Sequence, residues 1–210
     1  MSIGSSPRLK RFYGFFETYG TVRLNGLDES YFRDLSDWER EEAWNFLVKN
    51  AVLSEEAIKG LYILDKERAI KLFKDVIATP LMNTESITER KELEVSRLVL
   101  LNYINNVEPD VKYVNAMCDF ANSAFEEVRS LFASSLPISP VTSEAVDALK
   151  RMIFTEVERA PLALAITKYM AIHGMDFDME NPMYESIYRS LRSENPLEKM
   201  SGMKRLQRVH

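Results

Sequence analysis

The chain has 210 residues, of which 46% are hydrophobic and 28% are charged. This balance is typical of a folded globular protein and excludes an extended disordered chain. The formal net charge of −5 disfavours binding to nucleic acid through a broad basic face. The one cysteine, Cys118, excludes an intramolecular disulfide and favours a reducing compartment, so we expect a cytoplasmic protein.

No apolar stretch of the sequence reaches about 18 residues, the length that a membrane-spanning helix needs. The beginning of the sequence also lacks a long apolar run that ends in a small-residue cleavage site. We therefore expect neither a membrane segment nor a targeting signal. With only 7 Gly and 8 Pro, the chain has too few turn residues for many short strands, and this predicts an all-α protein.

The first 35 residues are rich in aromatic side chains and contain Gly14, Gly20 and Gly26. We expect this segment, residues 1–35, to be irregular and to cover one end of the fold. Residues 36–210 then form a helical domain. Apolar periodicity predicts ten helices in it, which span residues 37–49, 54–63, 66–78, 88–106, 110–121, 124–135, 143–158, 160–173, 182–192 and 196–208.

Four pairs of residues have the spacings that begin helices. Two are capping boxes, in which a Ser and a Glu three residues later satisfy backbone donors reciprocally. The other two place an Asn before a Pro at the first helical position, where the missing N–H costs nothing. These pairs are Ser36–Glu39, Ser123–Glu126, Asn181–Pro182 and Asn195–Pro196.

The second helix of each successive pair is predicted to begin near residues 54, 89, 124, 160 and 196, which are 35 or 36 residues apart. A fixed period of this size indicates a solenoid, here of about five antiparallel helix pairs. Taking Val128 as the reference, the equivalent positions are Ile58, Leu93, Leu164 and Met200. All are apolar and lie about one turn inside their predicted helices, so the register extends beyond the helix starts. An irregular helical bundle is the alternative.

Two segments match the helix–turn–helix pattern of a repeat most completely. Residues 109–137 contain a helix, a tight turn and the pair Val128-Arg129, and residues 55–77 contain apolar residues on both sides of Asp65. Both segments resemble HEAT repeats, in which antiparallel helix pairs stack into a curved superhelix. The resemblance implies an α-solenoid fold more firmly than it implies a function.

The chain departs from the HEAT pattern at two points. Ser123 stands where the family often has an Asp that pairs with the arginine, so the partner of Arg129 is left open. The Val-Arg pair is also absent from the other predicted repeats. We expect Arg129 to contact a neighbouring repeat rather than to take part in catalysis.

Motifs for catalysis are absent from the sequence. There is no G-x-x-x-x-G-K-[ST], G-x-G-x-x-G, G-x-S-x-G or H-E-x-x-H. We expect His173, in the last turn of a predicted helix, to cap that helix, and Cys118 to be a core residue. We therefore expect a protein without enzyme activity, cofactor or metal.

The charge distribution suggests a binding surface. Residues 25–70 contain eleven acidic and six basic residues, whereas the last fifteen residues carry Lys199, Lys204, Arg205 and Arg208 against Glu198. The acidic region can attract a basic protein, and ordinary solvated helix faces are the alternative. The candidate protein-binding residues are Asp34, Asp37, Glu41, Trp44, Glu55 and Tyr62.

These observations favour a non-catalytic protein that binds another protein on one face of a solenoid. A sharper hypothesis is a bacterial immunity or neutralising protein that masks a basic toxin, such as a nuclease. The alternatives are a regulatory adaptor and a HEAT-like alkylpurine DNA glycosylase, which needs a basic groove for the duplex. The sequence gives no indication of the oligomeric state.

Overall fold

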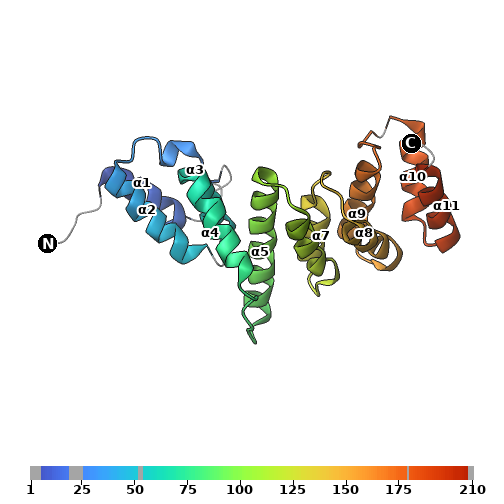
Figure 1. The fold of residues 1–210 in the computed structure, drawn as a ribbon, viewed down its shortest axis with the longest axis horizontal. Coiled ribbons are helices and arrows are strands. Elements are labelled where there is room, and N and C mark those ends of the chain that lie inside the picture. The colour runs from blue at the N-terminus through green and yellow to red at the C-terminus, as the bar shows by residue number, and fades with distance from the viewer. Residues whose placement is uncertain (1–5, 19–25, 52–53, 179, 208–210) are drawn as a thin grey trace. The chain divides into compact units, whose positions relative to one another are not determined.

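A computed structural model describes residues 6–18, 26–51, 54–178 and 180–207 (Figure 1). In these residues all regular secondary structure is helical, with eleven α-helices and two 3-10 helices, which confirms the predicted all-α class. None of the helices in the described ranges combines the length and apolarity needed to cross a bilayer.

The chain divides into two compact units, residues 1–100 and 101–210, and the boundary falls inside α5 (Ile87–Val107). The first unit also contains α1 (Pro7–Glu17), η2 (Glu29–Tyr31), α2 (Asp37–Asn50), α3 (Glu55–Leu64) and α4 (Lys66–Ala78). The second contains α6 (Val111–Cys118), η3 (Asp119–Asn122), α7 (Glu126–Ser135), α8 (Ser143–Thr155), α9 (Arg159–Ile172), α10 (Pro182–Arg192) and α11 (Pro196–Leu206).

Helix α1 lies in the segment that was expected to be irregular, so that expectation is wrong for residues 7–17. Its start has a cap followed by Pro: the Ser6 hydroxyl accepts the Leu9 N–H at 3.2 Å, and Pro7 is the first helical residue. The predicted segment also includes residues 1–5 and 19–25, which lie outside the described residues.

An aromatic cluster holds α1 against α2. The rings of Phe12, Tyr13 and Phe16 on α1 lie 5.0–5.6 Å, centroid to centroid, from the ring of Phe46 on α2. Edge-to-face pairs of this kind are stabilising beyond the area that they bury. Phe12, Phe15 and Phe32 are buried, so part of this aromatic segment belongs to the core of the first unit.

Helix α3 packs closely on α2 because of Gly60. A Cβ atom at this position would lie 2.6 Å from Leu27 and 2.9 Å from Leu47, which is closer than atoms can approach without a shift. The glycine thus allows this close approach, and a larger residue here would require the methyl groups of Leu27 and Leu47 to shift. Helix α4 packs in turn against α3.

In the second unit each helix packs mainly against the helices one or two positions away along the chain. Helix α9 packs against both α7 and α8, and α6 packs against α8. Helices α10 and α11 form a hairpin in which α10 packs on α9 and α11 packs on α8.

Three of the four predicted helix starts are confirmed. Ser36 and Glu39 form the predicted capping box, and Asn181 and Asn195 cap α10 and α11 ahead of Pro. The capping box at Ser123 is wrong, because α7 begins at Glu126. The Ser123 hydroxyl instead accepts the Phe125 N–H in the turn that follows η3.

Cationic side chains tie the C-terminal ends of four helices to other helices. In each pair an Arg or Lys donates to a backbone carbonyl in or just after the last turn of a neighbouring helix, where carbonyls lack a partner within the helix. Burial lowers the pKa of both lysines. The pairs are Arg40 with Leu64, Arg97 with Ile77, Lys168 with Leu136 and Lys199 with Ile153.

The predicted 35-residue register holds only in part. Ile58, Leu93 and Val128 are buried, and Leu164 is half-buried. Met200 differs from these positions, since it is 46% exposed and α11 turns Lys199 and Met203 inward instead. The corresponding helices begin at Glu55, Ile87, Glu126, Arg159 and Pro196, which are 32, 39, 33 and 37 residues apart.

Candidate functional site

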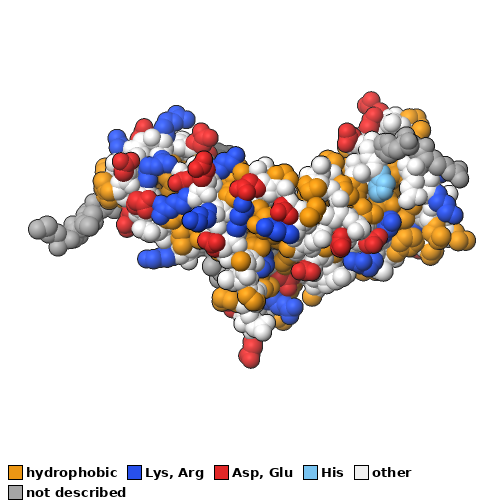
Figure 2. Space-filling view, in the orientation of Figure 1, with side chains coloured by type: hydrophobic (Ala, Val, Ile, Leu, Met, Phe, Trp, Pro, Cys, Tyr) orange, Lys and Arg blue, Asp and Glu red, His pale blue; other side chains and the backbone are white. Residues whose placement is uncertain are grey.

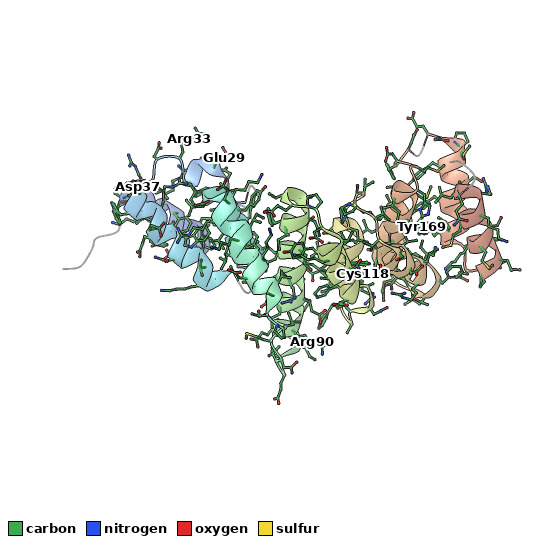
Figure 3. All side chains as sticks on the ribbon, viewed as in Figure 1. Glu29, Arg33, Asp37, Arg90, Cys118 and Tyr169 are labelled. Carbon is green, nitrogen blue, oxygen red and sulfur yellow. The ribbon has the colours of Figure 1, made fainter. Side chains whose placement is uncertain are left out.

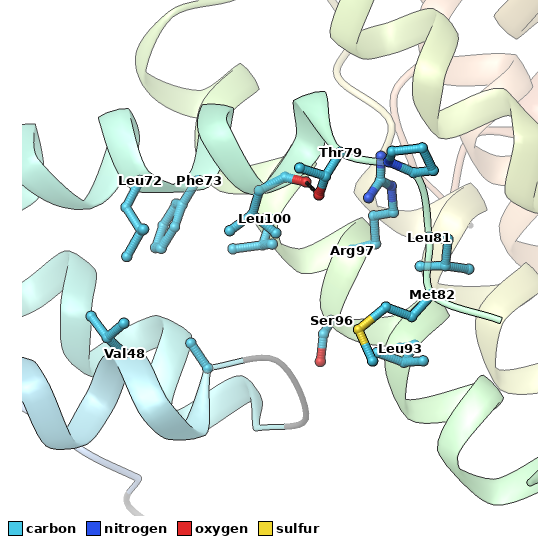
Figure 4. Close-up of a pocket in the computed structure, with 13 residues that line it drawn as sticks. Val48, Leu72, Phe73, Thr79, Leu81, Met82, Leu93, Ser96, Arg97 and Leu100 are labelled. Carbon is cyan, nitrogen blue, oxygen red and sulfur yellow. Dashed lines mark hydrogen bonds between the residues drawn. The ribbon is translucent and has the colours of Figure 1, made fainter. Parts of the chain in front are cut away.

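An open apolar groove lies within the first unit, between α2, α4 and α5 (Figure 4). Its cavity has a volume of about 310 Å³. Val48 comes from the end of α2, Leu72 and Phe73 from α4, and Leu93 and Leu100 from α5. The groove is therefore built from three segments that are separated in the sequence.

The connection between α4 and α5 forms one wall of the groove. Helix α4 ends at Ala78 because Thr79 is extended and Pro80, which follows it, has no N–H to continue the helix. The connection then carries Leu81 and Met82 across the groove, and Met82 is 62% exposed. A large apolar side chain exposed beside an apolar cavity is typical of a binding surface.

Few polar groups line the groove. Arg97 on α5 donates from Nη2 to the Ile77 carbonyl at 2.6 Å, and Thr79 donates from Oγ1 to the Val76 carbonyl at 2.7 Å. Ser96 adds a hydroxyl from a buried position on α5. No carboxylate, histidine or cysteine is among the described lining residues, so the groove is suited to binding apolar groups rather than to acid–base chemistry.

Two of the predicted binding residues are linked by Arg68. The Arg68 Nη1 lies 2.5 Å from the Glu41 carboxylate, and the guanidinium stacks 4.1 Å from the centre of the Trp44 ring. Trp44 is only 5% exposed. The indole is thus a core group covered by Arg68, and a partner cannot reach it as an anchor while this packing holds.

The other four predicted residues are spread over the first unit. Asp34, Asp37 and Glu55 are exposed, and Tyr62 is half-buried with the Lys66 Nζ 5.7 Å from its ring centre. None of the six predicted residues lines the groove. The structure therefore does not bring the predicted residues together at the apolar site.

Acidic and basic side chains are interspersed over the face of the first unit that Figure 2 shows. Glu29, Arg33 and Asp37 all lie at the surface near the start of α2 (Figure 3). Asp28 beside them has a lowered pKa, because the hydroxyl and the backbone N–H of Ser30 donate to its carboxylate. On the face that Figure 2 shows, the acidic side chains of this unit therefore alternate with cations.

His173 and Cys118 both have structural contacts, but Cys118 is half-buried and lines a polar hollow, so its predicted place in the core is wrong. The Cys118 thiol donates to the Val114 carbonyl at 3.4 Å, and burial, together with nearby Asp119 and Glu144, raises the thiol pKa to about 11. His173 is the C-cap of α9, where its Nδ1 donates to the Tyr169 carbonyl at 2.8 Å. A thiol with this pKa remains protonated near neutral pH and is a poor nucleophile.

The second unit contains a polar hollow of about 580 Å³ between α6, η3 and α8. Asp119, Glu144 and Asp147 line it together with Arg151. In the part of the chain that the structure describes, no three His, Cys, Asp or Glu side chains are placed to hold a metal ion.

Comparisons of the chain with models of protein families, with curated proteins and with solved structures find no match. The functional interpretation therefore rests on the geometry of this chain. The apolar groove is the feature that points most directly to a function, and no residue in it was among the sequence-based candidates. The signal for it in the sequence is the apolar pair Leu81-Met82 directly after Pro80, in a segment that is otherwise polar.

Proposed function

We propose that the chain is a non-catalytic protein-binding protein, and that the groove between α2, α4 and α5 receives an apolar segment of its partner. The observation that supports this proposal is an open cavity of about 310 Å³ with apolar side chains on three sides and exposed Met82 at its rim. Grooves between helices commonly bind the apolar face of an amphipathic helix, whose anchors recur every three or four residues.

We propose in addition that the helix pairs form a HEAT-like α-solenoid. The packing of α6 on α8 and of α7 on α9 within the second unit supports this, because equivalent helices of successive repeats lie side by side in a solenoid. The contact of Arg129 on α7 with Glu156, which follows α8, is a further link between successive pairs.

The partner that we propose is a basic protein, in line with the immunity or neutralising hypothesis. Exposed carboxylates at Asp34, Asp37 and Glu55 can attract such a partner before the groove engages it. A regulatory adaptor would use the same groove in the same way. The DNA glycosylase alternative is less favoured, because an apolar lining does not supply the cationic phosphate contacts that a duplex needs.

The test is a pair of charge substitutions in the groove. Val76→Glu with Met82→Glu places two carboxylates at the groove, where the described side chains are partly exposed and the core is not disturbed. We expect the wild-type protein to retain a specific partner from an extract of its source cell, and the double variant to lose at least about nine-tenths of it. Cross-linking from position 82 should then identify an apolar segment of that partner.

Val111→Glu is the matched control, since Val111 is an exposed valine on α6 outside the groove. It should retain the partner as the wild type does, and circular dichroism should show that all three proteins are equally helical. Retention of the partner by the groove variant, or a cross-linked product that is nucleic acid, would argue against the proposal.

A further inference from the structure

Helix α11 presents to solvent a stripe of four residues, two of which are large and apolar. Leu197 is 73% exposed and Met200 is 46% exposed, and the stripe continues through Ser201 and Lys204, which are also exposed. At about 100° per residue, positions i, i+3, i+4 and i+7 share one face of a helix. This stripe lies opposite the inward face of α11, and none of the described residues covers it.

Large apolar side chains are also exposed at and after the end of α8. Phe154 at the end of α8 is exposed, and the Lys199 Nζ lies 5.8 Å from the centre of its ring. Val157, three residues further on, is also exposed. Phe154 therefore adds one exposed ring where the end of α8 meets α11.

Two opposite charges flank the stripe on the edge of α11 that faces α10. Glu198 borders a small polar hollow together with Ser186 and Arg189 of α10. Arg205 points to the same edge, because its Nη1 and Nη2 both lie 3.2 Å from the Ser186 hydroxyl. Seven residues separate the two charges, so they lie two turns apart on one side of the stripe.

We propose that α11 is a self-association surface, on which the α11 helices of two copies of this chain pack antiparallel about a twofold axis near Met200 and Ser201. The twofold axis brings Leu197 of each copy against the aliphatic stem of Lys204 of the other. Met200 packs at the centre. A contact of this type is isologous, so every pairing occurs twice.

Charge complementarity selects this arrangement. In antiparallel helices the same edge of each helix meets its equivalent, so Glu198 of one copy lies against Arg205 of the other, and the reverse pair forms as well. In a parallel pairing in register, the edges that carry these charges would lie on opposite sides of the interface, so Glu198 and Arg205 would form no pair between the copies. A second copy of the chain would therefore cover Leu197 and Met200 and also pair with Glu198 and Arg205.

Charge reversal tests the proposal by analytical ultracentrifugation of the full chain. The wild type should show a concentration-dependent dimer. Glu198→Arg alone and Arg205→Glu alone should each raise the dimer dissociation constant at least about tenfold, because each places two pairs of like charges in the interface. Met200→Glu should abolish the dimer by burying charge in the stripe.

Mixing the two charge-reversal variants is the decisive measurement. A dimer of one Glu198→Arg chain with one Arg205→Glu chain again has two pairs of opposite charges, so the mixture should associate about as tightly as the wild type. A monomeric wild type, or a mixture that stays monomeric when the wild type dimerises, would overturn the proposal. Circular dichroism of each variant checks the fold, and the result is independent of partner binding in the groove, since the two surfaces share no residue.

Discussion

Arg129 has three contacts that fix its side chain at the boundary between α7 and α8. Its Nε lies 2.6 Å from one carboxylate oxygen of Glu156, its Nη2 lies 3.1 Å from the other, and its Nη1 donates to the Ser123 carbonyl at 2.9 Å. The side chains of Arg129 and Glu156 are only 16% and 5% exposed. Ser123 thus provides an acceptor through its backbone, where an Asp side chain was expected from the HEAT pattern.

Glu156 stays ionised because of these contacts. Burial by itself raises the pKa of this carboxyl group, but the hydrogen bonds from Arg129 and from the backbone N–H groups of Glu158 and Val157 outweigh burial and leave the pKa lowered. A bidentate pair with additional donors is the arrangement in which a partly buried ion pair can be stabilising. Removal of one partner should therefore be costly.

We predict that Arg129→Ala lowers the free energy of unfolding by about 3–5 kcal/mol, because it leaves the Glu156 carboxylate without its cation. Urea unfolding at neutral pH measures this. The double variant Arg129→Met with Glu156→Leu should cost clearly less than Arg129→Ala, since it leaves no buried charge behind. A loss below about 1 kcal/mol for Arg129→Ala would place the pair among ordinary surface ion pairs.

At the scale of the element, one side chain at the start of α2 contacts the capping residues of two helices. The Glu39 carboxylate accepts the backbone N–H and the hydroxyl of Ser36, each at 2.7 Å, and also the hydroxyl of Ser6, which itself caps α1. The hydrogen bond from Ser6, followed by the two from Ser36, lowers the pKa of Glu39 to about 2. One carboxylate therefore joins the starts of α1 and α2.

We predict that Glu39 gives the protein an acid-sensitive contribution to stability. Its folded pKa of about 2 lies below its ordinary value of 4.5, so the contribution is fully present above about pH 4.5 and declines as the pH falls toward 2. Urea midpoints should be lower for Glu39→Gln than for the wild type at pH 7, and this difference should shrink at pH 3. Asp34→Asn, an exposed carboxylate nearby, is the control and should show no such convergence.

The elements were predictable where local signals decide them. The bounds of α4 and α10 agree with the predicted 66–78 and 182–192, because Asp65 and Asn181 cap them and their apolar residues recur at helical spacing. Helix α1 was missed although Ser6-Pro7 has the same form as Asn181-Pro182, because glycines and aromatic residues obscured the period. At Ser123 the local signal failed because the preceding 3-10 turn delays the start of α7.

At the scale of the whole molecule, the groove depends on contacts that a single sequence does not reveal. Its walls come from residues near 50, 75, 80 and 97, and only the fold brings them together. Trp44 shows the opposite case. A tryptophan is a common interface anchor, but the position of Trp44 on α2 buries its ring under Arg68. Residue type identified candidates for binding, whereas packing determined which side chains a partner can reach.

The repeat period makes a further prediction, because it treats Ile58, Val128 and Met200 as equivalent. The structure buries the first two completely and leaves Met200 46% exposed. Ile58→Asp and Val128→Asp should each cost more than about 4 kcal/mol, since each buries an unpaired carboxylate in a core. Met200→Asp should cost within about 0.5 kcal/mol, because its side chain remains in water.

Thermal and urea unfolding of the three variants measure this difference in stability. The protein concentration is kept low enough for the chain to be monomeric, so that self-association through α11 does not contribute. A severe loss in Met200→Asp would mean that α11 is rotated toward the core and that the 35-residue register extends through it. If only Ile58→Asp and Val128→Asp lose stability, the repeat is regular at α3 and α7, and α11 has its own register. The hydrogen bond from the buried Lys199 ammonium to the Ile153 carbonyl at the end of α8 then sets which face of α11 is buried.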